Sequence, residues 1–378
     1  MKQRRVNIGI VGGGLMGKEL FALVGRWDAL LDHPARPAIT AIADPSPDVQ
    51  NWFREVGVPN IYSDYKDLLS NVEIDVVYIA VPHNLHEEIY LATIDAGKDF
   101  LGEKPFGIDL EASQNIVSAV KKTSLFVRVS SELPFYPGAQ AVANFVKSGA
   151  VGEILEVRSG LLHSSDIDIT KPINWKRQVR FCGEIGVMGD LGMHAAHLPL
   201  RLGFKPQTVY ALIDKVVLTR KNSEGIDVPC DTSDNAVLAI KATESNQKRE
   251  FPMFWEMKRI APGESNTWFI HIMGMRGGAA FSTRNPATFE RFTYDGKEQV
   301  WSQIQPGHKS NWPVITGAIF EFGFPDALLQ MWAAYLAERE GKLGNRFACA
   351  GVEEALDSHR VFNAALKSHS NGSHVQVK

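Results

Sequence analysis

The strongest indication of the fold is the stretch Val6-Asn7-Ile8-Gly9-Ile10-Val11-Gly12-Gly13-Gly14-Leu15-Met16-Gly17. Its first half is a continuous apolar run, as expected for a strand that is buried on both faces. Its second half spaces glycines as Gly12-x-Gly14-x-x-Gly17, and a helical pattern runs from Leu15 to Leu31. Glycines in this order permit a tight turn, a close approach of the backbone to a pyrophosphate, and close helix–strand packing. The stretch therefore predicts a dinucleotide-binding loop in a parallel α/β sheet.

The first 130 residues alternate strand-like and helical segments. After the opening strand we expect strands at 39–43, 61–62, 76–81, 100–102 and 126–129, with helices at 47–56, 85–96 and 110–122. Repeated strand–helix alternation implies a doubly wound parallel sheet with helices on both faces. We therefore expect residues 1–130 to form an NAD(P)-binding Rossmann domain.

Asp44 ends the second expected strand, where a carboxylate can accept hydrogen bonds from an adenosine ribose. Residues 45–50 contain no Arg or Lys that would attract a 2′-phosphate, so the sequence favours NAD over NADP. A tight turn that binds no ligand is the alternative interpretation of the glycines. The cofactor-binding residues expected here are Gly12, Gly14, Leu15, Met16, Gly17 and Asp44.

The pattern changes after Ser130, where longer strand-like runs replace the alternation. They lie at 154–161, 208–218, 236–243, 250–258, 268–273 and 288–294, and helical segments follow at 326–338 and 352–368. We expect residues 131–378 to form a C-terminal α+β domain for substrate binding and oligomerisation, with an open, largely antiparallel sheet and helices to one side. In one variant of this division, the C-terminal helix packs back on the N-terminal domain.

Composition narrows the functional class. The chain has 378 residues, is 44% hydrophobic and 22% charged, and carries a formal net charge of −3. A nucleic-acid partner would call for a basic patch, and a membrane span for about 18 consecutive apolar residues; neither is present. The three cysteines form no paired motif, and residues 1–11 lack the pattern of a signal peptide. We therefore expect a cytoplasmic protein without nucleic-acid or membrane partners.

Two strand ends carry the candidate chemistry of the first domain. Glu103-Lys104-Pro105 follows the strand at 100–102, and the segment from Val81 to His86 follows the preceding strand. Alcohol oxidation passes a hydride to nicotinamide and a proton to a base, and a lysine beside a cationic ring binds its own proton less tightly. A solvated lysine at a strand end is the alternative. We expect Lys104 to be catalytic and to bind the cofactor together with Val81, Pro82, His83, His86 and Glu103.

A glycine-rich helical segment supplies the second candidate group. Asp190, His194 and His197 are spaced i, i+4, i+7, so they share one helix face. A carboxylate one turn before a histidine can fix its tautomer, so that His194 accepts a proton from a hydroxyl group. Two alternatives stay open, namely core histidines and a three-ligand zinc site. We expect catalytic roles for Asp190 and His194, substrate binding by His197, and no metal.

The chain resembles the Gfo/Idh/MocA family, named after glucose–fructose oxidoreductase and inositol dehydrogenase. The matching pieces lie between residues 1 and about 200, and are Gly12–Gly17, Pro82–His86, Ala96-Gly97-Lys98, Glu103-Lys104-Pro105, Gly152-Glu153-Ile154 and Gly186–His194. The resemblance implies bound NAD(P), a carbohydrate-like substrate, and a homodimer or homotetramer. It also implies that Lys104 is the catalytic lysine. Asp190 and His194 match the first two members of the family's Asp-x-x-x-His-x-x-Asp pattern, whereas His197 replaces the third.

Four further residues are weaker candidates. Trp175 and Arg177 lie in a loop before the Asp190 segment, where an aromatic ring and a cation suit a sugar, although a surface loop is an equal alternative. His163 ends a strand-like run and is a further expected substrate contact. Glu132 stands where many members of the resembled family have an Asn-Arg type of segment, and the sequence assigns it no role.

These expectations combine into an NAD-dependent oxidoreductase. It would transfer a hydride between nicotinamide and a hydroxyl or ketone group of a sugar, polyol or glycoside, with Lys104 and His194 as proton-transfer groups. One alternative is a glycoside-cleaving enzyme that oxidises, eliminates and recycles its NAD in place. A second alternative is a non-catalytic dinucleotide-binding sensor.

Overall fold

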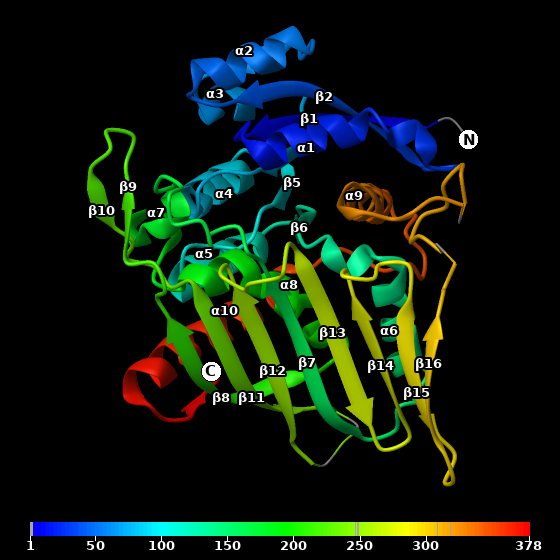
Figure 1. The fold of residues 1–378 in the computed structure, drawn as a ribbon. Coiled ribbons are helices and arrows are strands. Elements are labelled where there is room, and N and C mark those ends of the chain that lie inside the picture. The colour runs from blue at the N-terminus through cyan, green and yellow to red at the C-terminus, as the bar shows by residue number, and fades with distance from the viewer. Residues whose placement is uncertain (1–2, 246, 248, 308, 318) are drawn as a thin grey trace. The chain divides into compact units, whose positions relative to one another are not determined.

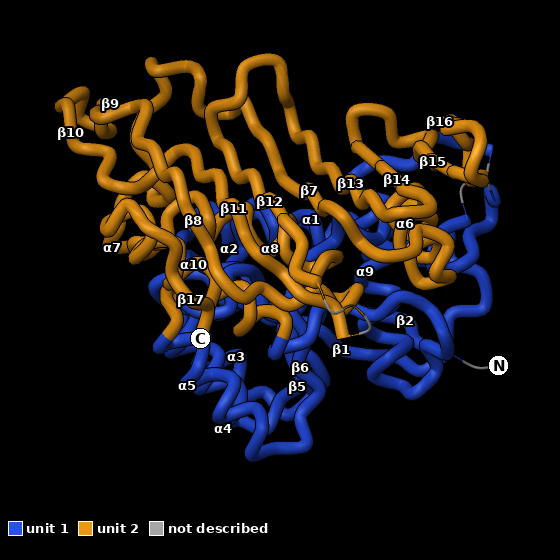
Figure 2. Tube along the Cα trace, turned by 90° about the horizontal axis from the view of Figure 1, so that it is seen from below, with its two compact units in different colours: residues 1–107, 111–135, 309–353 blue, residues 108–110, 136–308, 354–378 orange. Residues whose placement is uncertain are grey.

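A computed structural model describes residues 3–245, 247, 249–307, 309–317 and 319–378. They form two compact units, coloured separately in Figure 2. Unit 1 contains residues 1–107, 111–135 and 309–353, and unit 2 contains residues 108–110, 136–308 and 354–378. Residues 309–353, which the sequence pattern places in the second domain, thus belong to the unit that carries the glycine loop.

Unit 1 is built on a six-stranded parallel sheet with the order β3-β2-β1-β4-β5-β6 (Figure 1). This is the strand order of a dinucleotide-binding Rossmann fold. The strands are β1 (Arg4–Val11), β2 (Ala35–Ala43), β3 (Asn60–Tyr62), β4 (Val76–Ile79), β5 (Asp99–Gly102) and β6 (Val127–Val129). The helices are α1 (Leu15–Val24), α2 (Pro47–Glu55), α3 (Tyr65–Leu69), α4 (His86–Asp95), α5 (Leu110–Val120) and α9 (Phe324–Arg339). The predicted Rossmann sheet is confirmed.

The first helix is shorter than the sequence pattern predicts. The pattern extends to Leu31, but α1 ends at Val24 with Gly25 as its C-cap, and a 3₁₀ turn follows at Trp27–Ala29. The Trp27 indole then donates a hydrogen bond to the carbonyl oxygen of Ala35. The helix thus gives way to this turn although the apolar spacing continues.

Long-range contacts attach residues 309–353 to the β5–β6 edge of the unit 1 sheet. Arg128 of β6 forms an ion pair with Glu338 of α9, and Arg339 donates to the Asp99 carboxylate at 2.8 Å. The Val129 amide also donates to the Ala350 carbonyl oxygen at 2.9 Å. These partners lie more than 200 residues apart in the sequence, so local pattern could not reveal them.

Unit 2 is built on a nine-stranded sheet with the order β16-β15-β14-β13-β7-β12-β11-β8-β17. Only the β7–β12 pair is parallel among the described pairings of this sheet, so the predicted largely antiparallel sheet is confirmed. The strands are β7 (Ile154–Leu162), β8 (Lys205–Asp214), β11 (Asn235–Thr243), β12 (Phe251–Lys258), β13 (Thr267–Gly274), β14 (Gly277–Ser282), β15 (Phe289–Tyr294), β16 (Gln299–Ile304) and β17 (Val375–Gln376). A separate hairpin pairs β9 (Thr219–Lys221) with β10 (Asp227–Pro229).

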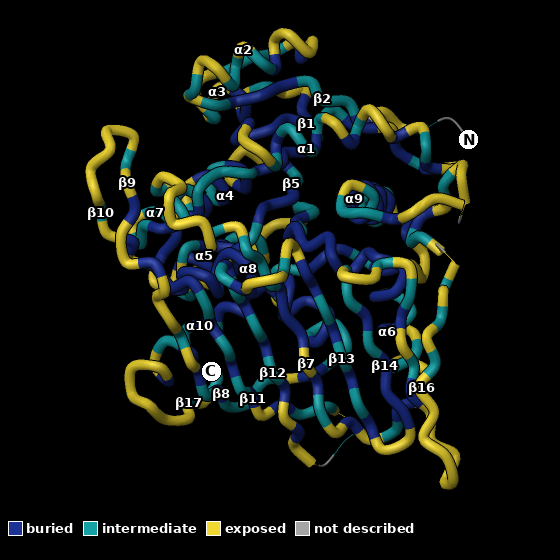
Figure 3. Tube along the Cα trace, in the orientation of Figure 1, coloured by how far each residue is buried: buried dark blue, intermediate teal, exposed yellow. Residues whose placement is uncertain are grey.

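The helices of unit 2 are α6 (Pro137–Lys147), α7 (Val179–Cys182), α8 (Gly186–Arg201) and α10 (Val352–Asn371), the last from Glu354 onward. Helix α8 packs on β7 and β12, and the Ser159 hydroxyl donates to the Ala195 carbonyl oxygen across this contact. Every residue of α8 from Gly186 to Pro199 is buried (Figure 3). Polar side chains on such a helix need partners, because unpaired polar groups are costly to bury.

Strand β8 stops earlier than the apolar run 208–218 predicts. It ends at Asp214, because the amides of Val216 and Val217 donate to the Asp234 carboxylate at 2.7 and 2.9 Å. A side chain brought in by the tertiary structure thus takes the place of a strand partner.

Among the described residues, no helix is long and apolar enough to cross a membrane.

Candidate active site

The glycine loop joins β1 to α1, and the surroundings of each fingerprint position show why it is occupied by glycine. Gly12 has a φ of +93°, and a Cβ there would lie 2.4 Å from the Ala80 carbonyl oxygen. A Cβ on Gly17 would lie 2.5 Å from the Gly12 carbonyl oxygen. A Cβ on Gly14 would meet no protein atom within 4 Å. Two positions are therefore closed by the protein's own backbone, whereas Gly14 faces open space.

The start of α1 has the properties of an anion-binding helix end. Its N-cap is Gly14, which offers no side-chain hydrogen bond to the first turn, and that turn contains no acidic residue. Leu15 is 76% exposed and Met16 is half-buried. Uncapped amides and the helix dipole at such an end favour a phosphate group.

Asp44 lies beside this loop, as the sequence predicts. Its carboxylate accepts hydrogen bonds from the Gly13 amide at 2.8 Å and from the Ser46 amide at 2.9 Å. The Gln50 side chain donates to the Asp44 carbonyl oxygen at 2.7 Å. The acidic side chain at the end of β2 is thus fixed against the turn that follows β1.

The segment after β4 is tied to the segment after β5 through His86. Its ring is fully buried, with Nδ1 2.7 Å from the Pro105 carbonyl oxygen and Nε2 3.0 Å from the Val81 carbonyl oxygen. Burial lowers the pKa of His86, and the two carbonyl groups oppose that shift. His83 is also buried, with its ring centre 5.4 Å from that of His86. His86 thereby ties the segment at Val81 to the segment that follows Lys104.

The Glu103–Lys104 segment is held from two sides. The Tyr78 hydroxyl donates to the Glu103 carboxylate at 2.6 Å, and the Tyr90 hydroxyl donates to the Glu103 carbonyl oxygen at 2.6 Å. Burial, together with the Glu103 charge, raises the pKa of Tyr78 well above its usual range, so the phenol stays a donor. Lys104 follows directly, with its side chain half-buried at the carboxyl edge of the sheet. The backbone that carries Lys104 is therefore fixed by buried hydrogen bonds.

Glu132 is a residue of this edge to which the sequence assigned no role. Its side chain follows β6 and is only 5% exposed. Burial and the Glu103 charge raise its pKa to about 7. An acidic residue directly after a predicted buried strand was the available sequence signal, but only the fold places it next to Glu103 and Lys104.

In unit 2, helix α8 carries Asp190, His194 and His197, which are 4%, 4% and 0% exposed. The Asp190 carboxylate accepts hydrogen bonds from Lys176 Nζ at 2.9 Å and from Arg259 Nε at 3.1 Å. The sequence placed the three helix residues on one face but did not link either cation to Asp190. The two cations lie 14 and 69 residues from Asp190 in the chain, so no local motif links them to it.

Arg177, a predicted substrate contact, is enclosed by carboxylates. Its side chain is 1% exposed and forms ion pairs with Asp166 and Asp234. Burial lowers the pKa of Arg177 to about 10, with the neighbouring arginines acting in the same direction and Asp234 against them. The guanidinium group is enclosed within the protein, whereas the adjacent Lys176 reaches Asp190 with a side chain that is 40% exposed.

Trp175 and His163 are both half-buried. Lys176 Nζ lies 5.6 Å from the Trp175 ring centre, so the indole borders the Asp190 group. His163 Nδ1 is 3.2 Å from the Ser265 carbonyl oxygen. The structure thus connects Trp175 to Asp190 through Lys176 and sets His163 against the loop after β12.

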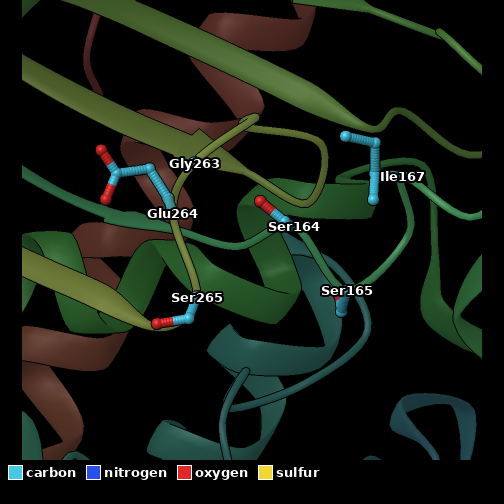
Figure 4. Close-up of a pocket in the computed structure, with 6 residues that line it drawn as sticks. All are labelled: Ser164, Ser165, Ile167, Gly263, Glu264 and Ser265. Carbon is cyan, nitrogen blue, oxygen red and sulfur yellow. The ribbon is translucent and has the colours of Figure 1, made fainter.

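An open pocket of about 560 Å³ includes Ser164, the residue that follows His163, and Figure 4 shows its lining side chains. It is lined by Ser164, Ser165, Ile167, Gly263, Glu264 and Ser265. Glu264 is paired with Arg284, whose hydrogen bond lowers the Glu264 pKa. The pocket offers hydroxyl groups next to His163 but includes none of the α8 side chains.

The zinc alternative for the α8 residues requires at least three ligating side chains in one group. Over the part of the chain that the structure describes, no three His, Cys, Asp or Glu side chains are grouped to hold a metal ion. Asp190 instead makes ion pairs with Lys176 and Arg259. Its charge is therefore balanced by side-chain cations.

Comparisons with known proteins match the chain to NAD-binding oxidoreductases. Residues 6–131 match the model of an oxidoreductase family with an NAD-binding Rossmann fold, the Gfo/Idh/MocA family. The chain is 27% identical over 335 residues to levoglucosan dehydrogenase of Pseudarthrobacter phenanthrenivorans, covering 85% of this chain and 82% of that relative. It is 25% identical to an uncharacterized oxidoreductase of Bacillus subtilis, covering 77% and 78% of the two chains.

Solved structures share the whole fold. A levoglucosan dehydrogenase in complex with NADH superimposes with a TM-score of 0.88 at 22% identity, covering 99% of this chain and 100% of the other. An inositol dehydrogenase homolog from Azotobacter vinelandii, complexed with NAD⁺, gives a TM-score of 0.80 at 18% identity, covering 99% and 97%. Residues 6–131, which contain the glycine loop, Asp44 and Lys104, thus match the NAD-binding Rossmann domain of the Gfo/Idh/MocA oxidoreductase family.

Proposed function

We propose that this chain is an NAD-dependent dehydrogenase of a sugar, polyol or glycoside hydroxyl group, with Lys104 and His194 as proton-transfer groups. The observation that carries the proposal is the fixed position of Lys104. Buried hydrogen bonds from Tyr78 and Tyr90 hold the preceding Glu103, at the sheet edge where Rossmann folds bind their ligands.

The residues present fit a dinucleotide. The uncapped start of α1 suits a pyrophosphate, and the open space at Gly14 allows its close approach. Asp44 offers a carboxylate for a ribose, and exchange of its contact with the Gly13 amide would free an oxygen for that role. Val81, Pro82, His83, His86, Glu103 and Lys104 would line the remainder of the cofactor site.

When bound, NAD supplies the hydride acceptor. Lys104 would then accept the hydroxyl proton as an amine, or hydrogen-bond the oxygen that loses it. In the reverse direction, its ammonium group would return the proton to a ketone. Glu103 and His86 would keep the lysine backbone in place through the contacts described above.

The α8 group of unit 2 would handle the substrate. His194 would accept or return a proton, and Asp190 would set the charge beside it. Lys176 and Arg259 hold that carboxylate, so the effective partner of His194 is an acid already bound by two cations. His197 and Trp175 would contact substrate, with His163 at the margin.

The substrate class comes from the relatives. Structures of levoglucosan dehydrogenase include complexes with NADH and levoglucosan and with NADH and L-sorbose. Trp175 with Lys176 provides an aromatic face beside a cation, a surface that suits the carbon face and hydroxyl groups of such molecules. We therefore extend a carbohydrate-like substrate to this chain.

We also propose that the chain forms a homodimer or homotetramer. Alternation along the strands puts Leu212, Phe254 and Trp301 on the sheet face opposite α8, and Leu212 and Trp301 are exposed. Exposed apolar side chains on an open sheet face favour association. Light scattering of the purified chain measures this directly, and a monomer at all accessible concentrations would contradict it.

The activity test is a screen of anhydrosugars, polyols and glycosides with NAD⁺, following NADH absorbance and analysing products in parallel. On any substrate found, Lys104→Met should lower kcat by about 10²–10⁴-fold, the usual contribution of an acid/base group. His194→Asn should lower it comparably. Lys122→Met, which changes an exposed lysine of unit 1, is the matched control.

Full turnover by Lys104→Met would refute its role. Cleavage of a glycoside without accumulation of NADH would instead favour the recycling alternative. Tight NADH binding without turnover on any compound would favour a sensor.

A further inference from the structure

Glu132 is brought to the Lys104 segment by the pairing of two parallel strands. Gly102 at the end of β5 pairs with Val129 of β6. One step further, the Ser130 amide donates to the Gly102 carbonyl oxygen at 2.9 Å. Two residues beyond these partners are Lys104 on one segment and Glu132 on the other, so both leave the sheet at the same edge.

The surroundings of Glu132 bring several ionisable groups together. Its carboxyl group is 5% exposed and interacts electrostatically with Glu103, Lys104 and Tyr78. The helix packed against this segment, α9, presents the uncharged Met331, whose sulfur accepts the Ser131 amide hydrogen bond at 3.2 Å. Among the described groups that act on Glu132 are the charges of Glu103 and Lys104, and the Tyr78 phenol interacts with it as well.

The two charged neighbours act on Glu132 in opposite directions. Burial is the largest cause that raises the Glu132 pKa to about 7, and the Glu103 charge adds to it. The Lys104 charge lowers the same pKa. By reciprocity, ionised Glu132 must favour the charged form of Lys104.

We propose that Glu132 is a positioning residue for Lys104. The charge of the buried Glu132 carboxyl group acts on the amine of Lys104. The inference rests on the proposed role of Lys104 and deepens it. Glu132 touches neither cofactor nor substrate in this account. It acts through Lys104, and it differs from a purely structural residue because its charge changes near neutral pH.

The direction of the effect follows from the charges. Below about pH 7 the Glu132 carboxyl group is neutral, and above it the carboxylate stabilises the ammonium form of Lys104. Lys104 can accept the hydroxyl proton only in its amine form, so in that role the Glu132 carboxylate delays the rise of kcat with pH. Glu132→Gln removes that charge. It should move the alkaline rise of kcat to lower pH by on the order of one unit, equal to about tenfold in rate at a fixed pH within the rise.

The first measurement needs no turnover. Infrared spectra of protein labelled with carbon-13 glutamate follow the carbonyl stretch of protonated carboxyl groups as pH is raised. A band that titrates near pH 7 should be present in the native chain and absent in Glu132→Gln. Glu111→Gln, an exposed glutamate of α5, is the matched control and should leave the band unchanged.

The second measurement tests the coupling with Glu132 left in place. Lys104→Met removes the positive charge, so the Glu132 band should titrate at higher pH than in the native chain. The third measurement is the pH profile of kcat in native chain, Glu132→Gln and Glu111→Gln.

The three results separate this inference from the proposed function. A missing band, or a band that Lys104→Met leaves unmoved, overturns the inference whether or not the chain is active. A coupled band with an unmoved kcat profile also overturns it. A coupled band in a chain that oxidises no alcohol overturns the proposed function, and with it the positioning role in catalysis, while the Glu132–Lys104 coupling stands.

Discussion

Replacing Arg177 distinguishes a structural role of this side chain from a role in substrate binding. The sequence suggests a cation for the substrate, whereas the structure encloses Arg177 between Asp166 and Asp234. We expect Arg177→Met to be mainly a stability mutation. Methionine keeps an unbranched apolar stem of similar reach but removes the charge and all five donors.

The magnitude depends on what each carboxylate retains. Asp166 keeps Arg220, whose nearest nitrogen is 3.8 Å away, and is itself partly exposed. Asp234 is 1% exposed and keeps the Val216 and Val217 amides, which cannot neutralise a full charge. Removing one partner of a buried ion pair costs about 3–5 kcal/mol, because it leaves the other charge uncompensated. We expect a loss in that range.

A second change isolates the charge effect. Asp234→Asn in the Arg177→Met background removes the stranded charge, while the amide oxygen can still accept from the Val216 and Val217 amides. The double variant should therefore recover about 2 kcal/mol relative to the single variant, within the usual coupling of contacting residues.

Urea unfolding followed by circular dichroism measures these differences. Arg180→Met is the matched control, because Arg180 is an exposed arginine of the same segment whose described contacts are hydrogen bonds to Gln178 and a ring contact with Phe181. Its unfolding should change by less than about 0.5 kcal/mol. An Arg177→Met chain with native stability and a raised substrate KM would refute the structural role and restore the original prediction.

Three further predictions concern unit 1. The pKa of Glu132 is about 7 in the folded chain, against an ordinary 4.5, so the folded state favours the protonated carboxyl group. Its contribution to stability is complete below pH 4.5 and is lost as the pH rises through 7. Over 2.5 pH units the loss is about 3 kcal/mol. Between pH 4.5 and 8, the free energy of unfolding of Glu132→Gln, measured in urea, should therefore rise by about that much relative to the native chain. A pH-independent difference would contradict this, and Glu111→Gln is the control. Gly12→Ala should lower both Tm and NADH affinity, because its Cβ would lie 2.4 Å from the Ala80 carbonyl oxygen. Gly14→Ala should keep its Tm and lose NADH affinity in fluorescence titration, because its Cβ meets no protein atom, and unchanged affinity would place the phosphates elsewhere.

The Rossmann sheet could be predicted because its signals are local. The apolar run of β1, the glycines and the helical spacing after Leu15 all lie within one short stretch. The positive φ of Gly12 follows from the tight turn that this stretch must make. Asp44 was predictable for a similar reason, since the end of a parallel strand determines the edge at which its side chain lies.

The weaker predictions concern residues whose role depends on distant partners. Trp175, Lys176 and Arg177 are consecutive and look alike as loop residues, yet Lys176 reaches Asp190 and Arg177 is enclosed by carboxylates. The difference arises from side-chain direction in a 3₁₀ turn and from an aspartate 57 residues away. No pattern within the loop carries that information.

By itself, the sequence determined the parallel sheet, its cofactor loop and the family of the Rossmann domain, because these depend on backbone geometry encoded by adjacent residues. Which charged side chains lie close together depends instead on the folded chain. The tertiary structure brought residues 309–353 to the β5–β6 edge, put Glu132 beside Glu103 and Lys104, and gave Asp190 two cations. The physical reason is that the energy of a buried charge depends on its spatial neighbours and its access to water, and both are properties of the folded chain.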